Sequence, residues 1–405
     1  MNKTRSFTAL NAMREFLKLE TAGGALLIIA TVLALLLANI PLAHNAYEWF
    51  LGLHLTITIG GLGVDKPLLL WINDALMVLF FMLVGLELKR EILEGELASP
   101  DQVVLPVLAA IGGLLVPAAI FWFMNNDIAS QKNGWAIPTA TDIAFALAML
   151  SLLGSRVPVS LKIFLTTIAI VDDLAAIIII AIFYTSDLSL VSLILAAIGI
   201  IGLVILNRLK VMRLAPYMLV GLFIWLCVLK SGVHATLAGV VVAAFIPLRR
   251  DDGESPARHL EHALHPWVAF AVLPIFAFAN AGVSFHGMSM EKLSNGVPAG
   301  IILGLFLGKQ LGVFGMVGLA RLLRVAELPK GTSWGQIYGV AVLCGVGFTM
   351  SLFIGTLAYE HGDFDVLSGV KMGVLVGSLL SAVFGLVVLN FALPKISELK
   401  NEQTE

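Results

Sequence analysis

The dominant feature of the chain is a series of long apolar segments separated by short polar connections. A helix needs about 20 mostly apolar residues to cross the hydrocarbon core of a bilayer. The pattern therefore predicts an all-α polytopic membrane protein with twelve transmembrane helices. We place them at 16–41, 67–90, 103–125, 135–153, 159–184, 189–207, 214–230, 233–248, 262–284, 297–320, 336–358 and 366–392.

The positions of the cationic residues predict an orientation in the membrane. Lys and Arg are retained on the cytoplasmic side, and 19 of the 25 Lys and Arg residues fall on the same side as the N-terminus. The exceptions are Lys66, Lys132, Lys230, Lys292, Lys371 and Lys309, the last within a span. We therefore expect both termini in the cytoplasm, and the first apolar segment is too long for a cleavable signal.

The external connection at 53–66 has a different pattern from the other connections. Leu55 to Ile59 alternate apolar and Thr residues and are followed by Gly60 and Gly61, which favours a strand, a turn and a second strand. An isolated two-stranded ribbon is marginally stable and has unpaired edges. We expect this β-hairpin to pair with a second copy of itself.

Composition narrows the class of protein. The chain is 59% hydrophobic and 13% charged, which excludes a soluble globular enzyme. The net charge of −2 and the lack of a long basic block argue against a nucleic-acid partner. Cys227 and Cys344 lie in apolar segments without a metal-ligand spacing, and we expect no cofactor. Because the connections are short, residues 1–405 are expected to form a single integral membrane domain.

Asp172 and Asp173 form the most unusual pair in the apolar segments. Ionisable groups at membrane depth are costly and are functional candidates for that reason. Two adjacent carboxylates in a low dielectric resist ionising together, so the pair can bind either a proton or a metal cation. The alternative is a buried ion pair that serves packing only.

Lys309 is the one cation placed deep within a predicted span. A buried Lys must pair with an anion or lose its proton, and Asp172 and Asp173 are its natural partners. If Na+ occupied the carboxylates, Lys309 would lose its counter-charge and release a proton, which would couple ion binding to proton release. The alternative is that Lys309 permanently neutralises an aspartate or the negative ends of broken helices.

Two predicted spans contain segments that are poor continuous helices. Pro138 and its β-branched neighbours interrupt the segment 134–145, and glycine and hydroxyl residues lie within 344–353. Irregular backbone at this depth is tolerated where it lines a cavity and directs half-helix dipoles at a ligand. Each break lies in the middle span of a three-span block, 103–184 or 297–392, and we expect these blocks to be inverted repeats.

The remaining charged candidates allow two interpretations each. Asp142, beside Thr141, either compensates positive half-helix ends or contributes to the ion path. Asp74 is expected to face the bundle interior, with a possible relay role. His234 lies near an external helix end, where an ordinary hydrogen-bonding role competes with proton transfer. Near a cytoplasmic helix start, His259, Glu261, His262 and His265 join Glu87 and Glu91 in either a pH-responsive mouth or a solvated helix end.

Several motifs together resemble the NhaA family of bacterial sodium/proton antiporters over nearly the whole chain. They are WINDALMVLFFMLVGLELKRE (71–91), GWAIPTATDIAFAL (134–147), GSRVPVSLKIFLTTIAIVDDLAAIIIIA (154–181), LKSGVHATLAGV (229–240), RHLEHALHPWVAF (258–270), LPIFAFANAGV (273–283) and LCGVGFTMSLFI (343–354). The string around Asp172 and Asp173 is highly specific.

The resemblance implies a twelve-span fold in which the two interrupted helices cross at mid-membrane. It also implies electrogenic exchange, with more H+ entering than Na+ or Li+ leaving. Asp172 and Asp173 are implied to bind Na+ or H+, and Lys309 to pair with Asp172. Asp142 is implied to balance helix ends, with Thr141 beside it.

Regulation and assembly are implied by the same resemblance. The residues implied in activation at alkaline pH are His234, Glu87, Glu91, Glu261 and His262. The external hairpin is implied in formation of a homodimer. The implied location is the bacterial inner membrane, with the lipid bilayer as the surroundings.

Two other classes of protein remain open on the residues alone. An intramembrane aspartyl protease needs two aspartates on different helices, and Asp142 with Asp172 would supply them. The consecutive pair Asp172–Asp173 and the lack of a G-x-G-D setting argue against this class. A cation-coupled solute symporter would need a pocket for an organic substrate. Na+ alone should collapse a preset pH gradient in an antiporter, whereas a symporter needs its solute.

Overall fold

The computed structural model of the chain is mostly helical, with one two-stranded sheet in the part of the chain that it describes. The described residues are 22–59, 62–95, 100–185, 188–248, 255–286, 289–359 and 364–394. The chain forms two compact units. The first comprises 1–29, 99–173 and 285–405, and the second comprises 30–98 and 174–284.

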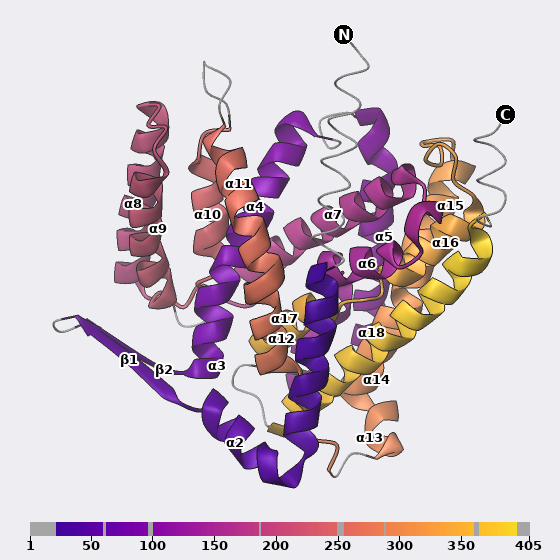
Figure 1. Cartoon of the computed structure of the whole chain (residues 1–405), viewed down its shortest axis with the longest axis horizontal. Coiled ribbons are helices and arrows are strands. Elements are labelled where there is room, and N and C mark those ends of the chain that lie inside the picture. The colour runs from indigo at the N-terminus through magenta and orange to yellow at the C-terminus, as the bar shows by residue number, and fades with distance from the viewer. Residues whose placement is uncertain are drawn as a thin grey trace. The chain divides into compact units, whose positions relative to one another are not determined.

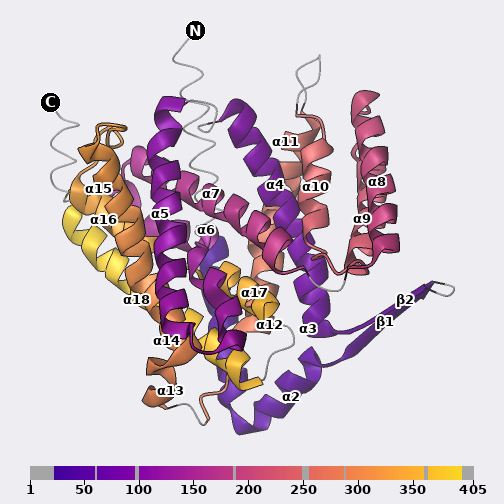
Figure 2. The same ribbon diagram turned by 180° about the vertical axis from the view of Figure 1, so that it is seen from behind.

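The first unit is built from helices of both halves of the chain. They are α5 (Pro100–Asn125), the 3₁₀ helix η3 (Ala129–Thr139), α6 (Ile143–Ser151), η4 (Gly154–Arg156), the first part of α7 (Val159–Phe183), α13 (Met290–Ser294), α14 (Gly296–Leu303), the π-helical segments η6 (Gly304–Gly308) and η7 (Gln310–Phe314), α15 (Gly315–Leu322), α16 (Trp334–Leu343), α17 (Phe348–Ala358) and α18 (Phe364–Ala392). The long α18 packs along α14 and α16 (Figure 2).

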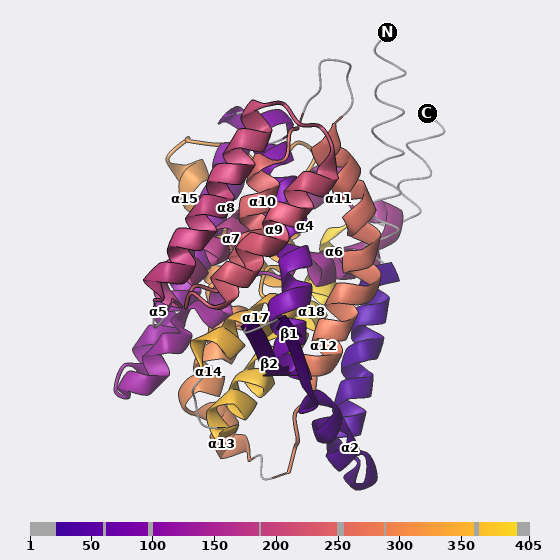
Figure 3. The same ribbon diagram turned by 90° about the vertical axis from the view of Figure 1, so that its left-hand side faces the viewer.

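The second unit has its own apolar core. Its elements are most of the helix Ala22–Asn39, α2 (Pro41–Leu51), β1 (His54–Ile59), β2 (Leu62–Pro67), α3 (Leu68–Trp71), the π-helical η1 (Ile72–Leu76), α4 (Met77–Glu94), the end of α7, α8 (Leu190–Arg208), α9 (Leu214–Leu229), α10 (Leu237–Phe245), α11 (Pro256–Trp267), the π-helical η5 (Val268–Val272) and α12 (Leu273–Ala281). Leu86, Tyr217 and Val242 are buried where α4, α9 and α10 pack together. The helices α8 and α9 lie side by side next to them (Figure 3).

Most of the predicted spans are present as membrane-length helices. Within the described residues, nine helices are long and apolar enough to cross a membrane, and the bent pair α16–α17 supplies a tenth. The segments predicted at 214–230 and 233–248 contain only α9, with 16 residues, and α10, with 9 residues. The connection between them turns at Gly232, whose φ is +82°, so α10 begins late. The chain is a multi-pass membrane protein, and the count of twelve spans stays a prediction.

Both helices predicted to be interrupted are interrupted. In the first, η3 ends at Thr139 and α6 begins at Ile143, with extended backbone between them. The unwound part is shorter than predicted, because 3₁₀ helix continues up to Thr139 even around Pro138. In the second, α16 and α17 meet at an angle of 41° across residues 344–347.

The two breaks lie against each other. The amide of Asp142 donates to the carbonyl oxygen of Val346 at 2.7 Å. The hydroxyl of Ser351 donates to the carbonyl oxygen of Ile137 at 2.7 Å. The prediction that the interrupted helices meet is therefore confirmed, and their depth in the membrane stays a prediction.

The predicted β-hairpin is also present. Its strands β1 and β2 pair antiparallel, with Thr56 opposite Asp65, and extend away from α2 and α3 (Figure 1). The hydroxyl of Thr56 donates to Asp65 Oδ1 at 2.7 Å, and this bond, with a further one from His54, lowers the pKa of the Asp65 carboxyl below its ordinary value. The predicted turn at Gly60 and Gly61 lies outside the described residues.

Candidate functional site

The two adjacent carboxylates lie within the continuous helix α7 and are buried. Asp172 is 0% exposed and Asp173 is 2% exposed. Neighbouring residues of a helix point about 100° apart, so the two side chains face different surroundings. The apolar residues around them in α7, such as Ile168 and Ala176, are buried as well. Protein therefore encloses both carboxylates, and their binding of Na+ or H+ stays a prediction.

Lys309 pairs with the first of these carboxylates. Its Nζ lies 2.6 Å from Asp172 Oδ2, and both side chains are fully buried. A charge-assisted hydrogen bond of this length between two buried side chains links the two groups strongly. The residues alone left Asp172 and Asp173 as possible partners and the resemblance implied Asp172, which is the partner in the structure.

The local backbone around Lys309 explains how the lysine reaches Asp172. Lys309 lies between the π-helical segments η6 and η7, and π-helical turns often occur at functional sites. The helix also crosses α5 closely, since a Cβ built on Gly112 would lie 2.2 Å from the carbonyl oxygen of Gly312. A Cβ built on the next residue, Gly113, would lie 3.5 Å from Lys309 Nζ. Small residues on α5 therefore leave the space that the lysine occupies.

Thr141 connects Asp172 to the second break. Its Oγ1 lies 2.6 Å from Asp172 Oδ2 and 2.8 Å from the carbonyl oxygen of Cys344. A hydroxyl group has one proton and donates to only one of these oxygens at a time. Asp172 Oδ1 is buried and has no hydrogen-bond partner among the described residues.

These contacts join Asp172, Lys309, Thr141 and the carbonyl group of Cys344, and we call this group, together with the adjacent Asp173, the carboxylate site. Carboxylate, hydroxyl and carbonyl oxygens are the ligands that hard cations prefer. The unpartnered Asp172 Oδ1 can accept a proton or a metal ion. The arrangement is therefore suited to binding a small cation in competition with H+.

Asp142 has a different role from the neighbouring Thr141. It is the N-cap of α6, and its Oδ1 accepts the amide of Phe145 at 3.0 Å. Its Oδ2 accepts the amide of Thr349 at 2.9 Å, in the first turn of α17, and the hydroxyl of the same residue. One carboxylate therefore compensates the positive N-terminal ends of two half-helices. These contacts favour the compensating role and do not orient Asp142 as a second protease aspartate.

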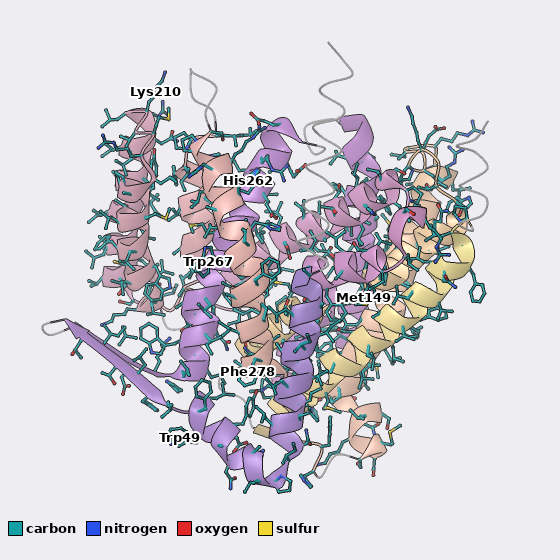
Figure 4. The ribbon with its side chains drawn as sticks, in the orientation of Figure 1. Trp49, Met149, Lys210, His262, Trp267 and Phe278 are labelled. Atoms are coloured by element: carbon teal, nitrogen blue, oxygen red, sulfur yellow. The ribbon has the colours of Figure 1, made fainter. Side chains whose placement is uncertain are left out.

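The structure gathers the predicted pH-responsive residues of α4 and α11 around Arg90. The guanidinium lies 2.7 Å from Glu91 and 2.9 Å from Glu261. Glu87 lies within electrostatic range of the same group. His262 is exposed on α11, and Figure 4 shows it toward the same end of the second unit as Lys210, away from Trp49. We call Arg90 and its three glutamates the Arg90 cluster.

Asp74 and His234 form a separate group at the other end of α10. Asp74, in the π-helical η1, pairs with Lys66 at 2.6 Å, and His234 Nε2 lies 3.9 Å from its other oxygen. Nδ1 of His234 is 2.8 Å from the hydroxyl of Thr236. Asp74 is thus tied to the end of the hairpin as well as to a histidine. Lys89, which precedes Arg90 in α4, donates to carbonyl oxygens at the C-terminal end of α10. His234 precedes the N-terminal end of α10, so it lies apart from the Arg90 cluster.

Sequence reasoning missed several contributors to these groups. The carbonyl oxygen of Cys344 has no side-chain signal, although the segment around it was predicted to be irregular. Thr349 lies in that same segment, and its hydroxyl was a usable signal. Ser378 contacts the start of α17, and its stretch of sequence indicates only a span. Lys66 contacts Asp74, and its stretch indicates only a strand.

Comparisons with known proteins find a matching family model and similar sequences over most of the chain. A family model described as Na+/H+ antiporter 1 matches residues 14–389. A protein of Pseudomonas putida (strain GB-1) named Na(+)/H(+) antiporter NhaA is 58% identical over 379 residues, covering 93% of this chain and 97% of the relative. A protein of the same name from Shewanella amazonensis is 57% identical over 387 residues, covering 96% and 99%. The similarity thus extends over almost the full length of both proteins.

Proposed function

The chain belongs to the Na+/H+ antiporter 1 family, and we propose that it exports Na+, or Li+, in exchange for H+ that enters through the carboxylate site. It is a multi-pass membrane transporter that exchanges Na+ and H+. We assign it to the bacterial inner membrane with both termini in the cytoplasm. The observation that carries the proposal is the fully buried pair Lys309–Asp172 with the Thr141 hydroxyl on the same carboxylate oxygen.

Competition between Na+ and H+ follows from the charges in this site. When Asp172 is ionised, Lys309 is its counter-ion. A Na+ ion that binds Asp172 and Asp173 replaces the ammonium group, and Lys309 then releases a proton because a lone buried ammonium is costly. A second proton leaves if Asp173 was protonated before Na+ arrived. Exchange of two protons for one Na+ would make transport electrogenic.

Access to the site is proposed to alternate between the two membrane faces. The breaks in the two interrupted helices place α6 and α17 beside Thr141 and Cys344, where their movement would open or close the site. We propose that the blocks 103–184 and 297–392 are inverted repeats within a twelve-span fold. Asp142 binds the ends of α6 and α17 and would keep them together as they move.

Activation at alkaline pH is proposed to depend on residues away from the carboxylate site. The Arg90 cluster joins α4 to α11 through the ion pair between Arg90 and Glu261, and Glu87 and Glu91 of α4 add negative charge around the same guanidinium. We include His234 and His262 in this response, His234 through its contact with Asp74. We further propose that the exposed hairpin joins two copies of the chain into a homodimer.

Replacement of either carboxylate tests the assignment of the site. We expect that Asp172→Asn and Asp173→Asn each abolish Na+-induced H+ release from the purified protein in proteoliposomes, because an amide cannot bind H+ or balance Na+. The exposed hairpin carboxylate Asp65 provides a matched control, and Asp65→Asn should exchange normally. Normal exchange in either Asp172→Asn or Asp173→Asn would remove that residue from the site.

A further inference from the structure

The N-terminus of α17 has no cap from its own segment. The first amides of a helix lack partners within the helix, and a preceding side chain usually accepts from them. The N-cap of α17 is Gly347, which has no side chain to do so. Acceptors from other helices take over this role, and Asp142 accepts from the amide of Thr349.

The other acceptor is Ser378 of α18. Its Oγ accepts the amide of Phe348, the first residue of α17, at 3.1 Å, and the group is buried. Two side chains from different helices therefore share the amides at the start of α17. Asp142 is a carboxylate that also caps α6, whereas Ser378 is neutral.

A second serine on the same face of α18 provides a comparison. Ser381 lies three residues after Ser378, so both face the break between α16 and α17. Ser381 is fully buried, and a Cβ built on Gly345 would lie 2.4 Å from its Oγ. Its hydroxyl has no hydrogen-bond partner among the described residues. The two serines thus share burial and location, and only Ser378 binds an amide of α17.

We propose that Ser378 is a positioning residue for ion exchange, which caps the first amide of α17 and so fixes the second break against Thr141 and Asp142. The inference rests on the exchange function proposed above. Few residues separate Ser378 from the carboxylate site, since α17 follows directly on residues 344–347. The carbonyl oxygens of Cys344 and Val346 in this segment contact Thr141 and Asp142. A displaced helix start would move these carbonyls.

The cap also has an electrostatic effect on a bound cation. The N-terminus of a helix acts as a partial positive charge that is concentrated on its free amides. If Phe348 lost its acceptor, its N–H would add to the positive potential at the break, beside the carboxylate site. Loss of the Ser378 hydroxyl should therefore weaken Na+ binding and leave the maximal rate largely unchanged.

The test compares Ser378→Ala with Ser381→Ala in the full-length protein in proteoliposomes. Na+-dependent H+ exchange is measured over a range of Na+ concentrations and normalised to the reconstituted protein. We expect a roughly three- to tenfold higher apparent KM for Na+ in Ser378→Ala, as for the loss of one hydrogen bond. We expect the wild-type KM in Ser381→Ala, and near wild-type KM in Ser378→Thr, which retains the hydroxyl.

Two results would overturn the proposed role of Ser378. A wild-type KM in Ser378→Ala, or the same increase in Ser381→Ala, would overturn the proposal and assign both serines to packing. If Ser378→Ala does not reconstitute, Ser378→Cys replaces it, since a thiol is a weaker acceptor of similar volume, and an unchanged KM there would overturn the proposal as well. Asp172→Asn in the same assay separates this inference from the proposed function, because its normal exchange would refute the carboxylate site whatever the Ser378 variants do.

Discussion

At the scale of single residues, the complete burial of Lys309 and Asp172 makes each depend on the other. Two ions removed from water are stable together only if they are well paired, and removal of one partner of a buried pair costs about 3–5 kcal/mol in proteins. The pair is therefore difficult to separate without a replacement cation. Na+ is such a replacement on the side of Asp172, and proton release removes the charge on the side of Lys309.

Replacement of Lys309 should change both the rate and the pH dependence of exchange. In Lys309→Ala the carboxylate of Asp172 loses its counter-ion, so H+ competes more strongly with Na+. We expect at least a tenfold lower rate at neutral pH and a pH profile displaced toward alkaline values, measured as Na+-induced H+ release from pH 5 to 9. Lys309→Arg retains the charge and should retain more activity.

The exposed Lys330 provides the matched control for this prediction, since Lys330→Ala removes a lysine far from any buried carboxylate in sequence and should leave the profile unchanged. A wild-type profile in Lys309→Ala would show that the lysine does not titrate during exchange.

The sequence predicted the charged members of the site and the neutral Thr141, and it did not predict the other neutral groups. Asp172, Asp173 and Lys309 stand out because ionisable groups in long apolar segments are costly. The carbonyl of Cys344 and the hydroxyl of Ser378 carry no such signal, because a peptide group and a serine occur in many spans. Their roles arise only when the second break packs against the first.

At the scale of elements, the breaks and the π-helical segments differ in how far they were predictable. The glycines of 344–347 interrupt a helix for a local reason, and Pro138 lies inside the 3₁₀ helix that ends at the first break. The segments η6 and η7 around Lys309 were not predicted, since their apolar pattern is equally compatible with an α-helix. Their geometry accompanies the close crossing with α5 at Gly112, a long-range contact.

This crossing leads to a prediction for Gly312. A Cβ there would lie 2.1 Å from the carbonyl oxygen of Gly112, so Gly312→Ala must separate α5 from η7. Such overpacking costs about 1–3 kcal/mol. We expect a lower melting temperature of the purified protein and a lower exchange rate, because Lys309 moves with η7.

Gly318 tests the same substitution in the same helix without the crossing. A Cβ built on Gly318 meets nothing within 4 Å, and Ala is the better helix former. Gly318→Ala should therefore melt at the wild-type temperature or slightly above it. Equal melting of Gly312→Ala and Gly318→Ala would contradict a tight crossing.

At the scale of the whole molecule, the apolar pattern predicted most spans because membrane-length helices have a simple requirement for apolar length. It was less informative for 214–230 and 233–248, where helix length depends on the local turn at Gly232. The division into two compact units was not predicted, since both units combine segments that are far apart in the chain. Hydropathy identifies helices and does not identify their neighbours.

The assembly of two copies is the last property that the structure allows us to test. The ends of the hairpin meet, because the amide of Leu68 donates to the carbonyl oxygen of Leu53 at 2.8 Å. Residues 54–67 can therefore be replaced by two glycines with little change in α2 and α3. We expect this variant to be a monomer by light scattering in detergent and to retain exchange, since the carboxylate site belongs to the first unit and the hairpin to the second.

The deletion also removes the ion pair between Lys66 and Asp74, so its effect must be separated from that of the ribbon. Lys66→Ala removes the pair and leaves both strands, and it should stay dimeric because the unpaired strand edges are unchanged. If Lys66→Ala dissociates as completely as the deletion, the ion pair rather than the ribbon maintains the assembly. If the deletion variant stays dimeric, another surface joins the two copies, and the proposed role of β1 and β2 is wrong.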